Sequence, residues 1–278
     1  MRRDKPALFA LRYALLLVLV LVTVFPFYYT LLNSFRDLRD VGDLDFRPTR
    51  LTTQNWAESF SGSTPGGRWL FNSVFVAFAI TTLSLITDTL TGYTFARKRF
   101  PGRDFLFMLV LSALTVPIGM LVIPIYVMMA KSGLINTYWA LILPAASVLG
   151  TFMMRQSISE LPIELDEAAR LDGCSDLQIL WHVIVPLVKP ALASVYIVLF
   201  LAHWNNFIYP LVVTNKTLMR TLPVGLYLMY PGGGMRTTPP EWGKMMVIAS
   251  VMIVPVLVVF LFLQDYFTRG LFASGMKG

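Results

Sequence analysis

The sequence is poor in the side chains that most often carry chemistry. Among its 278 residues there is one cysteine, Cys174, and there are two histidines, His182 and His203. A lone cysteine excludes an internal disulfide, and the histidines form no ligand cluster with it, so we expect no metal site. Neither a His-Glu-x-x-His helix nor a Gly-x-Ser-x-Gly turn occurs. We therefore expect no catalytic residue in this chain, which would then not be an enzyme.

Charge is scarce as well. Only 14% of the residues are charged and 56% are hydrophobic, whereas about 25% of a soluble domain is charged. Such a chain is too apolar for a soluble core, and lipid is the natural solvent for its surface. The net charge of +7 comes from basic residues dispersed among loops, without a stripe, so we expect no nucleic-acid partner.

Long hydrophobic runs take the place of the missing charges. Each run has at least 20 residues, enough to cross about 30 Å of hydrocarbon as a helix. The runs are continuous, which excludes the short alternating segments of a membrane β-barrel. We predict an all-α polytopic membrane protein, one transmembrane domain over residues 1–278, with six spans: Tyr13–Phe35, Trp69–Ala96, Phe105–Ala130, Ser132–Met154, Pro190–Asn215 and Met245–Gln264.

Basic residues indicate the orientation of these spans. Arg2, Arg3 and Lys5 precede the first run, which is too long for a signal peptide and has no small-residue cleavage site behind it. Six spans place both termini on one side, and with cytoplasmic termini the basic link Arg97–Arg103 is cytoplasmic too. The segment Thr214–Lys244 departs from the rule, because it is basic and would be external. We expect both termini in the cytoplasm.

The segment Arg155–Lys189, between the fourth and fifth runs, is the most informative loop. It has six carboxylates, and its apolar residues recur at the spacing of an amphipathic helix. We expect a first helix from Ser159, with Pro162 in its first turn, where proline is tolerated. The helix should carry an apolar face and an adjacent acidic stripe. The apolar face has Leu161, Leu165 and Ala168, and the stripe has Glu160, Glu164 and Glu167.

A turn and a second helix complete this loop. Gly173 should end the first helix, because glycine adopts the left-handed conformation of a C-terminal cap. The run Ser175–Gln178 has the spacing of a capping box, and we expect Pro186 to end the helix that it starts. The sequence thus predicts a helix–turn–helix at the membrane surface, with Ala168 and Ala169 small enough for close approach by a partner. The alternative is an amphipathic loop packed against its own bundle.

The 155–189 loop resembles the signature of a known family. The segment Glu167-Ala168-Ala169 is followed by three residues and Gly173, and then by nine residues and Val183-Ile184-Val185-Pro186. This pattern is similar to the signature loop of permease subunits of binding-protein-dependent ABC importers. That pattern normally ends Ile-x-Leu-Pro, and the two valines here keep its apolar character. The resemblance implies that Glu167, Ala168, Ala169, Gly173 and Pro186 couple the chain to an ATPase.

Further stretches resemble the carbohydrate-type permeases of the maltose-transporter-like group. The resemblance implies a second permease subunit, two ATP-binding subunits, an external solute-binding protein and a location in a prokaryotic inner membrane. ATP and Mg would be bound by the partner ATPase, because this chain has no GxxxxGK[S/T] loop and its glycine run at 232–234 continues as Met235-Arg236. The similar stretches are Phe71–Ser73, Ala96–Gly102, Gly133–Ala140, Trp204–Phe207, Arg220–Gly225 and Gly270–Gly278.

Polar residues within spans are the candidates for a solute pathway, because they are expensive in lipid. Trp204, Asn205, Asn206 and Tyr209 combine amides with aromatic faces, which suits a neutral polyhydroxylated solute. They could equally bond between helices. We expect Asp88 to pair within the bundle. An ion-coupled secondary transporter is the alternative function, but it would typically show paired repeats and more intramembrane charge.

Overall fold

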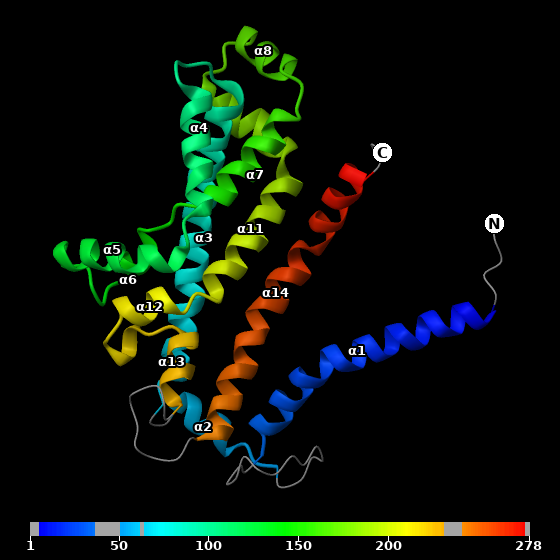
Figure 1. Ribbon diagram of the computed structural model, residues 1–278, viewed down its shortest axis with the longest axis vertical. Helices are drawn as coiled ribbons and strands as arrows, with labels where there is room; N and C mark the ends of the chain where they lie inside the picture. Colours follow the sequence, from blue (N-terminus) through cyan, green and yellow to red (C-terminus); the bar gives the residue numbers. More distant parts are fainter. Residues whose placement is uncertain (1–5, 37–50, 62–63, 231–240, 276–278) are drawn as a thin grey trace. The chain divides into compact units, whose positions relative to one another are not determined.

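The computed structural model describes residues 6–36, 51–61, 64–230 and 241–275, and within them every regular element is a helix (Figure 1). This confirms the all-α prediction. The glycine run at 232–234 lies outside the described residues. The helices are α1 (Pro6–Ser34), α2 (Gln54–Ser61), α3 (Gly66–Arg97), α4 (Arg103–Ser112), η1 (Ala113–Thr115), α5 (Ile118–Lys131), α6 (Tyr138–Ile142), α7 (Val148–Ser159), α8 (Glu164–Leu171), α9 (Asp176–Gln178), η2 (Ile179–Ile184), α10 (Val185–Leu187), α11 (Lys189–Trp204), α12 (Ile208–Val213), η3 (Thr217–Met219), α13 (Leu222–Met229) and α14 (Trp242–Gly275).

Three of the predicted spans are continuous helices. The segments Leu11–Ser34, Gly66–Arg97 and Trp242–Phe262 are each long and apolar enough to cross a bilayer. They correspond to the first, second and sixth hydrophobic runs of the sequence. By length and composition the described residues hold three such helices, or five if each of two bent pairs counts as one span. The count of six crossings stays a prediction.

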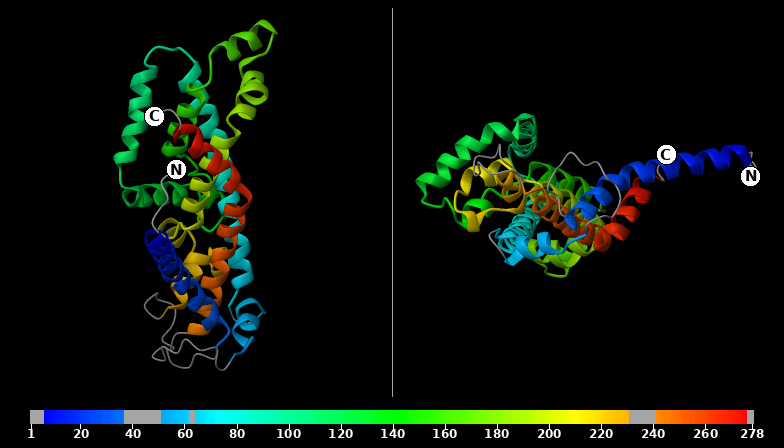
Figure 2. Two further views of the ribbon diagram at one scale, coloured as in Figure 1. Left: turned by 90° about the vertical axis from the view of Figure 1, so that its right-hand side faces the viewer. Right: turned by 90° about the horizontal axis from the view of Figure 1, so that it is seen from below.

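The prediction of one helix per run is wrong for the other three runs. Residues 105–130 bend by 104° between Arg103–Thr115 and Gly119–Lys131, beside Pro117 (Figure 2). Residues 132–154 divide into α6 and α7 around Pro144, and residues 190–215 divide into α11 and α12 after Trp204. Proline explains the first two breaks, because it donates no backbone hydrogen bond and disfavours a helical residue before it.

The chain forms two compact units. The first comprises Met1–Gly67 and Gly225–Val254. Within it, α2 is joined to the end of α1, where Asn55 donates to the Ser34 and Arg36 carbonyls at 3.2 and 2.7 Å. The start of α14 contacts α2 through Lys244, whose Nζ lies 2.7 Å from Glu58 Oε2. Short polar contacts therefore fix the three helix ends of this unit.

The second unit, Arg68–Val224 with Pro255–Gly278, contains the candidate site. Its longest helix is α3, and both ends of α3 hold a loop. At the N-terminal end, Trp69 Nε1 donates to the Thr217 carbonyl at 2.8 Å, and Asn72 Nδ2 donates to the Leu218 and Arg220 carbonyls at 2.8 and 2.9 Å. At the C-terminal end, Arg97 Nη2 donates to the Leu161 carbonyl at 2.9 Å. The 155–189 loop and the 214–222 segment therefore lie at opposite ends of one helix.

Asp88, in the C-terminal third of α3, bonds within the bundle as expected. Its Oδ1 accepts a hydrogen bond of 2.9 Å from Thr151 Oγ1 in the first turn of α7. Gly150 permits this approach, because a Cβ atom there would lie 2.0 Å from Asp88 Oδ2. The absence of a side chain at Gly150 therefore lets α7 pack closely against Asp88 of α3.

We predict that Gly150→Ala destabilises the subunit. Alanine is the better helix former by about 1 kcal/mol, but the clash with Asp88 should outweigh this and leave a net loss of about 1–3 kcal/mol. The matched control is Gly119→Ala on α5, where a Cβ would meet no atom within 4 Å. The measurement is the thermal midpoint of the detergent-solubilised protein. A midpoint for Gly150→Ala at or above that of Gly119→Ala would contradict this packing.

Candidate functional site

The 155–189 loop folds into two helical limbs at the C-terminal end of α3 (Figure 1). The first limb begins later than predicted. The helix α7 continues to Ser159, and α8 starts at Glu164 rather than at Ser159, after Pro162. The reason is local, since the residue before a proline disfavours helical geometry. Three carboxylates, Glu164, Asp166 and Glu167, then occupy the first turn of α8, where negative charge is favourable beside free backbone N–H groups.

Gly173 ends α8 in the predicted way. Its φ is +84°, in the left-handed region that favours glycine. The Cys174 N–H donates to the Ala169 carbonyl and the Gly173 N–H to the Arg170 carbonyl, both at 3.0 Å. These two bonds form a Schellman cap. The turn between the limbs is therefore set by backbone geometry, and the prediction for Gly173 is confirmed.

The second limb starts with the predicted capping box, in which the Ser175 N–H donates to Gln178 Oε1 at 2.8 Å. Its later course was not expected. Residues Ile179–Ile184 form a π-helix and the helix continues through Pro186 to Leu187. The segment Asp176–Leu187 then meets Lys189–Trp204 at 84°. The prediction that Pro186 ends this helix is wrong by one residue. A wider turn accommodates a proline, because it removes the need for the missing α-helical bond.

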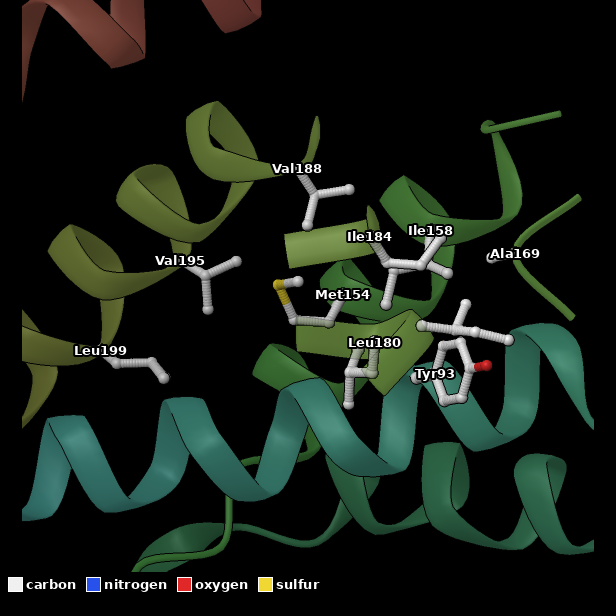
Figure 3. Close-up of a cluster of buried hydrophobic side chains, with 10 residues drawn as sticks. Tyr93, Met154, Ile158, Ala169, Leu180, Ile184, Val188, Val195 and Leu199 are labelled. Atoms are coloured by element: carbon white, nitrogen blue, oxygen red, sulfur yellow. The ribbon is translucent and has the colours of Figure 1, made fainter. Parts of the chain in front are cut away.

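An apolar core holds the two limbs against α3, α7 and α11 (Figure 3). In that view, Met154 and Ile158 of α7 meet Leu180 and Ile184 of the second limb, and Tyr93 comes from α3. The side chains of the cluster are almost completely buried: Tyr93, Met154, Ile158, Ala169, Ile179, Leu180, Ile184, Val188, Val195 and Leu199. The loop is thus a packed extension of the helices and not a mobile link.

This packing divides the predicted coupling residues. Glu167 and Ala168 are exposed, whereas Ala169 is buried in the core of the loop. Ala169 therefore cannot line a partner, because its small size serves internal packing. Leu171, which the sequence reading missed, is 90% exposed at the end of α8. It lies three and four residues after Ala168 and Glu167, so the three share one helix face. That spacing was the available signal.

Asp166 was also missed, and it forms an ion pair with α3. Its Oδ1 lies 3.4 Å from Arg97 Nε, and both side chains are buried. A second carboxylate, Asp176, contacts Lys98 and lies 3.2 Å from Arg170 Nη2 on the exposed side of the loop. The hydrogen bond from Lys98 holds the pKa of Asp176 below its usual range. Charged groups at the end of α3 thus contact both limbs.

The predicted pathway residues do not gather on one open surface. Asn205 is exposed, and its Nδ2 donates back to the Leu201 carbonyl at 2.9 Å, which caps α11. Tyr209 donates its hydroxyl to the Ala140 carbonyl. Trp204, Asn206 and Tyr209 line a cavity of about 20 Å³, which has room for about one water molecule. A sugar does not fit in this cavity as it stands.

These features define the class of protein, an all-helical membrane subunit with a rigid helix–turn–helix at one end of its spans. The family model described as "Binding-protein-dependent transport system inner membrane component" matches residues 88–273. The chain therefore belongs to this family of ABC-importer permease subunits, which are not enzymes.

Curated relatives match along almost the whole chain. The arabinooligosaccharides transport system permease protein AraQ of Halalkalibacterium halodurans is 38% identical and covers 92% of each chain. The sn-glycerol-3-phosphate transport system permease protein UgpE of Yersinia pestis is 32% identical and covers 94% of each. A crystal structure of a bacterial ABC transporter involved in the import of the acidic polysaccharide alginate has a chain of the same fold. Its TM-score is 0.83 at 23% identity, with 96% of this chain and 99% of that chain covered.

We predict that Asp176 adds a small amount to the free energy of unfolding and that this stabilisation is lost in acid. Because its pKa is lowered on folding, its stabilisation is present above the ordinary aspartate pKa of about 3.9 and is lost as the pH falls through the folded value. The pair is partly exposed, so the stabilisation should not exceed about 1 kcal/mol. Thermal midpoints of the native chain and of Asp176→Asn, measured from pH 7 down to pH 3, should converge in the acid range. A difference that grows towards low pH would show that the sign is wrong.

Proposed function

We propose that this chain forms part of the translocation pathway of an ATP-driven importer of a sugar or related polyol. In this proposal it works with a second permease subunit, two ATP-binding subunits that hold ATP and Mg, and an extracytoplasmic solute-binding protein. Two relatives whose names specify arabinooligosaccharides and sn-glycerol-3-phosphate support the substrate class. Membership of a binding-protein-dependent family favours this function over an ion-coupled transporter.

One observation carries the coupling role, the rigid construction of the 155–189 loop. The Schellman cap at Gly173 fixes the angle between the limbs, and the apolar core joins them to α3, α7 and α11. A force on the exposed face of Glu167, Ala168 and Leu171 is then transmitted to the helices instead of being lost in a flexible link. An anionic and apolar face of this kind suits a partner cleft with a basic residue beside apolar side chains.

The position of two segments at opposite ends of α3 supports a membrane topology in which they lie on opposite sides of the bilayer. With the 155–189 loop in the cytoplasm, the 214–222 segment at the other end of α3 lies outside, and both termini are cytoplasmic if the chain crosses six times. The N-terminal end of α3 holds this segment by hydrogen bonds. It therefore offers a firm external surface to a solute-binding protein.

The break between α11 and α12 remains our candidate for the solute pathway. Asn206, Trp204 and Tyr209 line one small cavity, which would have to open before a solute hydroxyl could reach them. Asn205 already uses its amide to cap α11. Of the two amides, Asn206 is thus the better placed to meet a solute.

The topology is tested with a membrane-impermeant maleimide on spheroplasts. Cys174, in the turn between the limbs, should be labelled only after permeabilisation. Lys216→Cys, in a Cys174→Ser background, should be labelled in intact spheroplasts, because residue 216 is exposed on the opposite end of α3. The reversed labelling pattern would invert the proposed orientation and exclude the coupling role of the loop.

The coupling role is tested with two variants of the loop. Glu167→Lys reverses a charge on the exposed face and should weaken association with the ATPase by about 1 kcal/mol or more. Gly173→Val places a β-branched residue at φ +84°, a strain of about 1–2 kcal/mol that should tilt α8. The matched control is Gly173→Asn, because asparagine visits the left-handed region more readily.

The measurements are co-purification of the ATPase and solute-stimulated ATP hydrolysis in liposomes. We expect both to fall for Glu167→Lys and Gly173→Val and to remain closer to native for Gly173→Asn. If both damaging variants keep full co-purification and full stimulated hydrolysis, the loop does not couple the subunits.

A further inference from the structure

A buried ion pair joins the first limb of the loop to the end of α3. Arg97 Nε lies 3.4 Å from Asp166 Oδ1, and the two side chains are 5% and 2% exposed. Arg97 also donates through Nη2 to the Leu161 carbonyl at 2.9 Å. One guanidinium therefore contacts both α8 and the turn that precedes it.

The Asp166 carboxylate depends on this single cation. Neither of its oxygens accepts a hydrogen bond from a described residue, so its contact with Arg97 is one of charge alone. A buried ion pair is weak evidence for stability, because removing two charges from water can cost as much as their attraction returns. Arg97, however, is held in place by the hydrogen bond that it donates to the Leu161 carbonyl, and such a bond is directional, unlike apolar packing. The pair is therefore better suited to fixing the position of α8 than to stabilising the fold.

The other contacts between α3 and the loop fix the position of α8 less well than this buried pair. Lys98, the next residue of α3, pairs with Asp176 of the second limb, but these side chains are 28% and 56% exposed. Exposed pairs of this kind are screened and hold their partners loosely. The apolar contacts around Ala169 hold α8 against its neighbours, but apolar attraction is non-directional. Among the described residues, Arg97 and Asp166 thus form the fully buried charged contact between α3 and the loop.

We propose that Arg97 and Asp166 are a positioning pair that makes α3 move together with the coupling loop. In chain order the loop is continuous with α7 and, beyond the 84° bend, with α11. The ion pair ties α8 to α3, which the apolar core already contacts through Tyr93, and so makes α3 a third driven helix. Since α3 also holds the 214–222 segment at its other end, motion of the loop reaches the far end of the unit. This inference rests on the proposed coupling function.

The test replaces the pair without leaving a lone buried charge. The double variant Arg97→Met/Asp166→Leu puts apolar side chains of similar shape in place of both charges, a change that is often tolerated in cores. Spin labels are attached at Thr94→Cys on α3 and Glu164→Cys on α8, both exposed positions, in a Cys174→Ser background. Lys98→Gln is the matched control, because it removes the exposed pair at the same helix end.

Two readouts decide the proposal. In the purified permease, the distance distribution between the labels should be narrow in the native chain and in Lys98→Gln, and broad in the double variant. In the complete transporter in liposomes, the double variant should retain its ATPase subunits and yet take up less solute per ATP hydrolysed, by roughly threefold or more. A purely structural role would lower the amount of assembled complex and leave this ratio unchanged.

An unchanged label distribution together with native uptake per ATP in the double variant would overturn the proposal. The label measurement does not involve the ATPase, so it separates this inference from the proposed function. A native complex without solute-stimulated hydrolysis would reject the proposed function, and with it the driven motion of α3. A broad distribution in the double variant would still show that the pair positions α8.

Discussion

Ile158, Ile179 and Ile184 are fully buried where the 155–189 loop packs beside α3, and the remaining features of the candidate site depend on this apolar contact. The loop is rich in carboxylates, and a polar segment of its length would otherwise stay in water. Its buried isoleucines supply the driving force for docking, since burying a side chain of this size is worth about 1.5–3 kcal/mol. The exposed face with Glu167 and Leu171 is presented at a defined angle because the opposite face is buried.

The same unit must also satisfy the backbone at the points where its spans break. Unpaired N–H and C=O groups are costly in lipid, and side chains meet part of this need. Thr137 and Ser147 accept hydrogen bonds from the first turns of α6 and α7. Ser84 donates to the Ala145 carbonyl within the break, at 2.6 Å. The break between α6 and α7 is therefore bonded to the rest of the protein, which is the setting in which irregular backbone is tolerated at membrane depth.

The helix α3 connects these requirements. Its N-terminal end bonds to the 214–222 segment, Asp88 in its C-terminal third holds α7 through Thr151, and its C-terminal end meets the 155–189 loop. Because a helix of hydrogen-bonded turns is stiff along its axis, a displacement of one end also displaces the other. In the proposed importer, an element of this kind would connect the ATPase with the solute-binding protein.

The sequence by itself determined the helical class, the signature loop and two local motifs within it. The Gly173 cap and the Ser175–Gln178 capping box were predictable because each depends on residues close together in the chain. The breaks within three apolar runs were only partly predictable. Hydrophobicity reports the length of a run, whereas Pro117 and Pro144 decide whether the helix continues.

Other features were decided by tertiary structure. No local pattern indicates that Asp166 meets Arg97, because 69 positions separate them and the contact exists only once the loop docks on α3. For the same reason Ala169 looked available to a partner until its burial was seen. Asn205 and Asn206 are adjacent and chemically identical, yet one caps a helix and the other lines a cavity. The sequence specifies the chemistry of each side chain, but the group that a side chain contacts depends on which helices pack together.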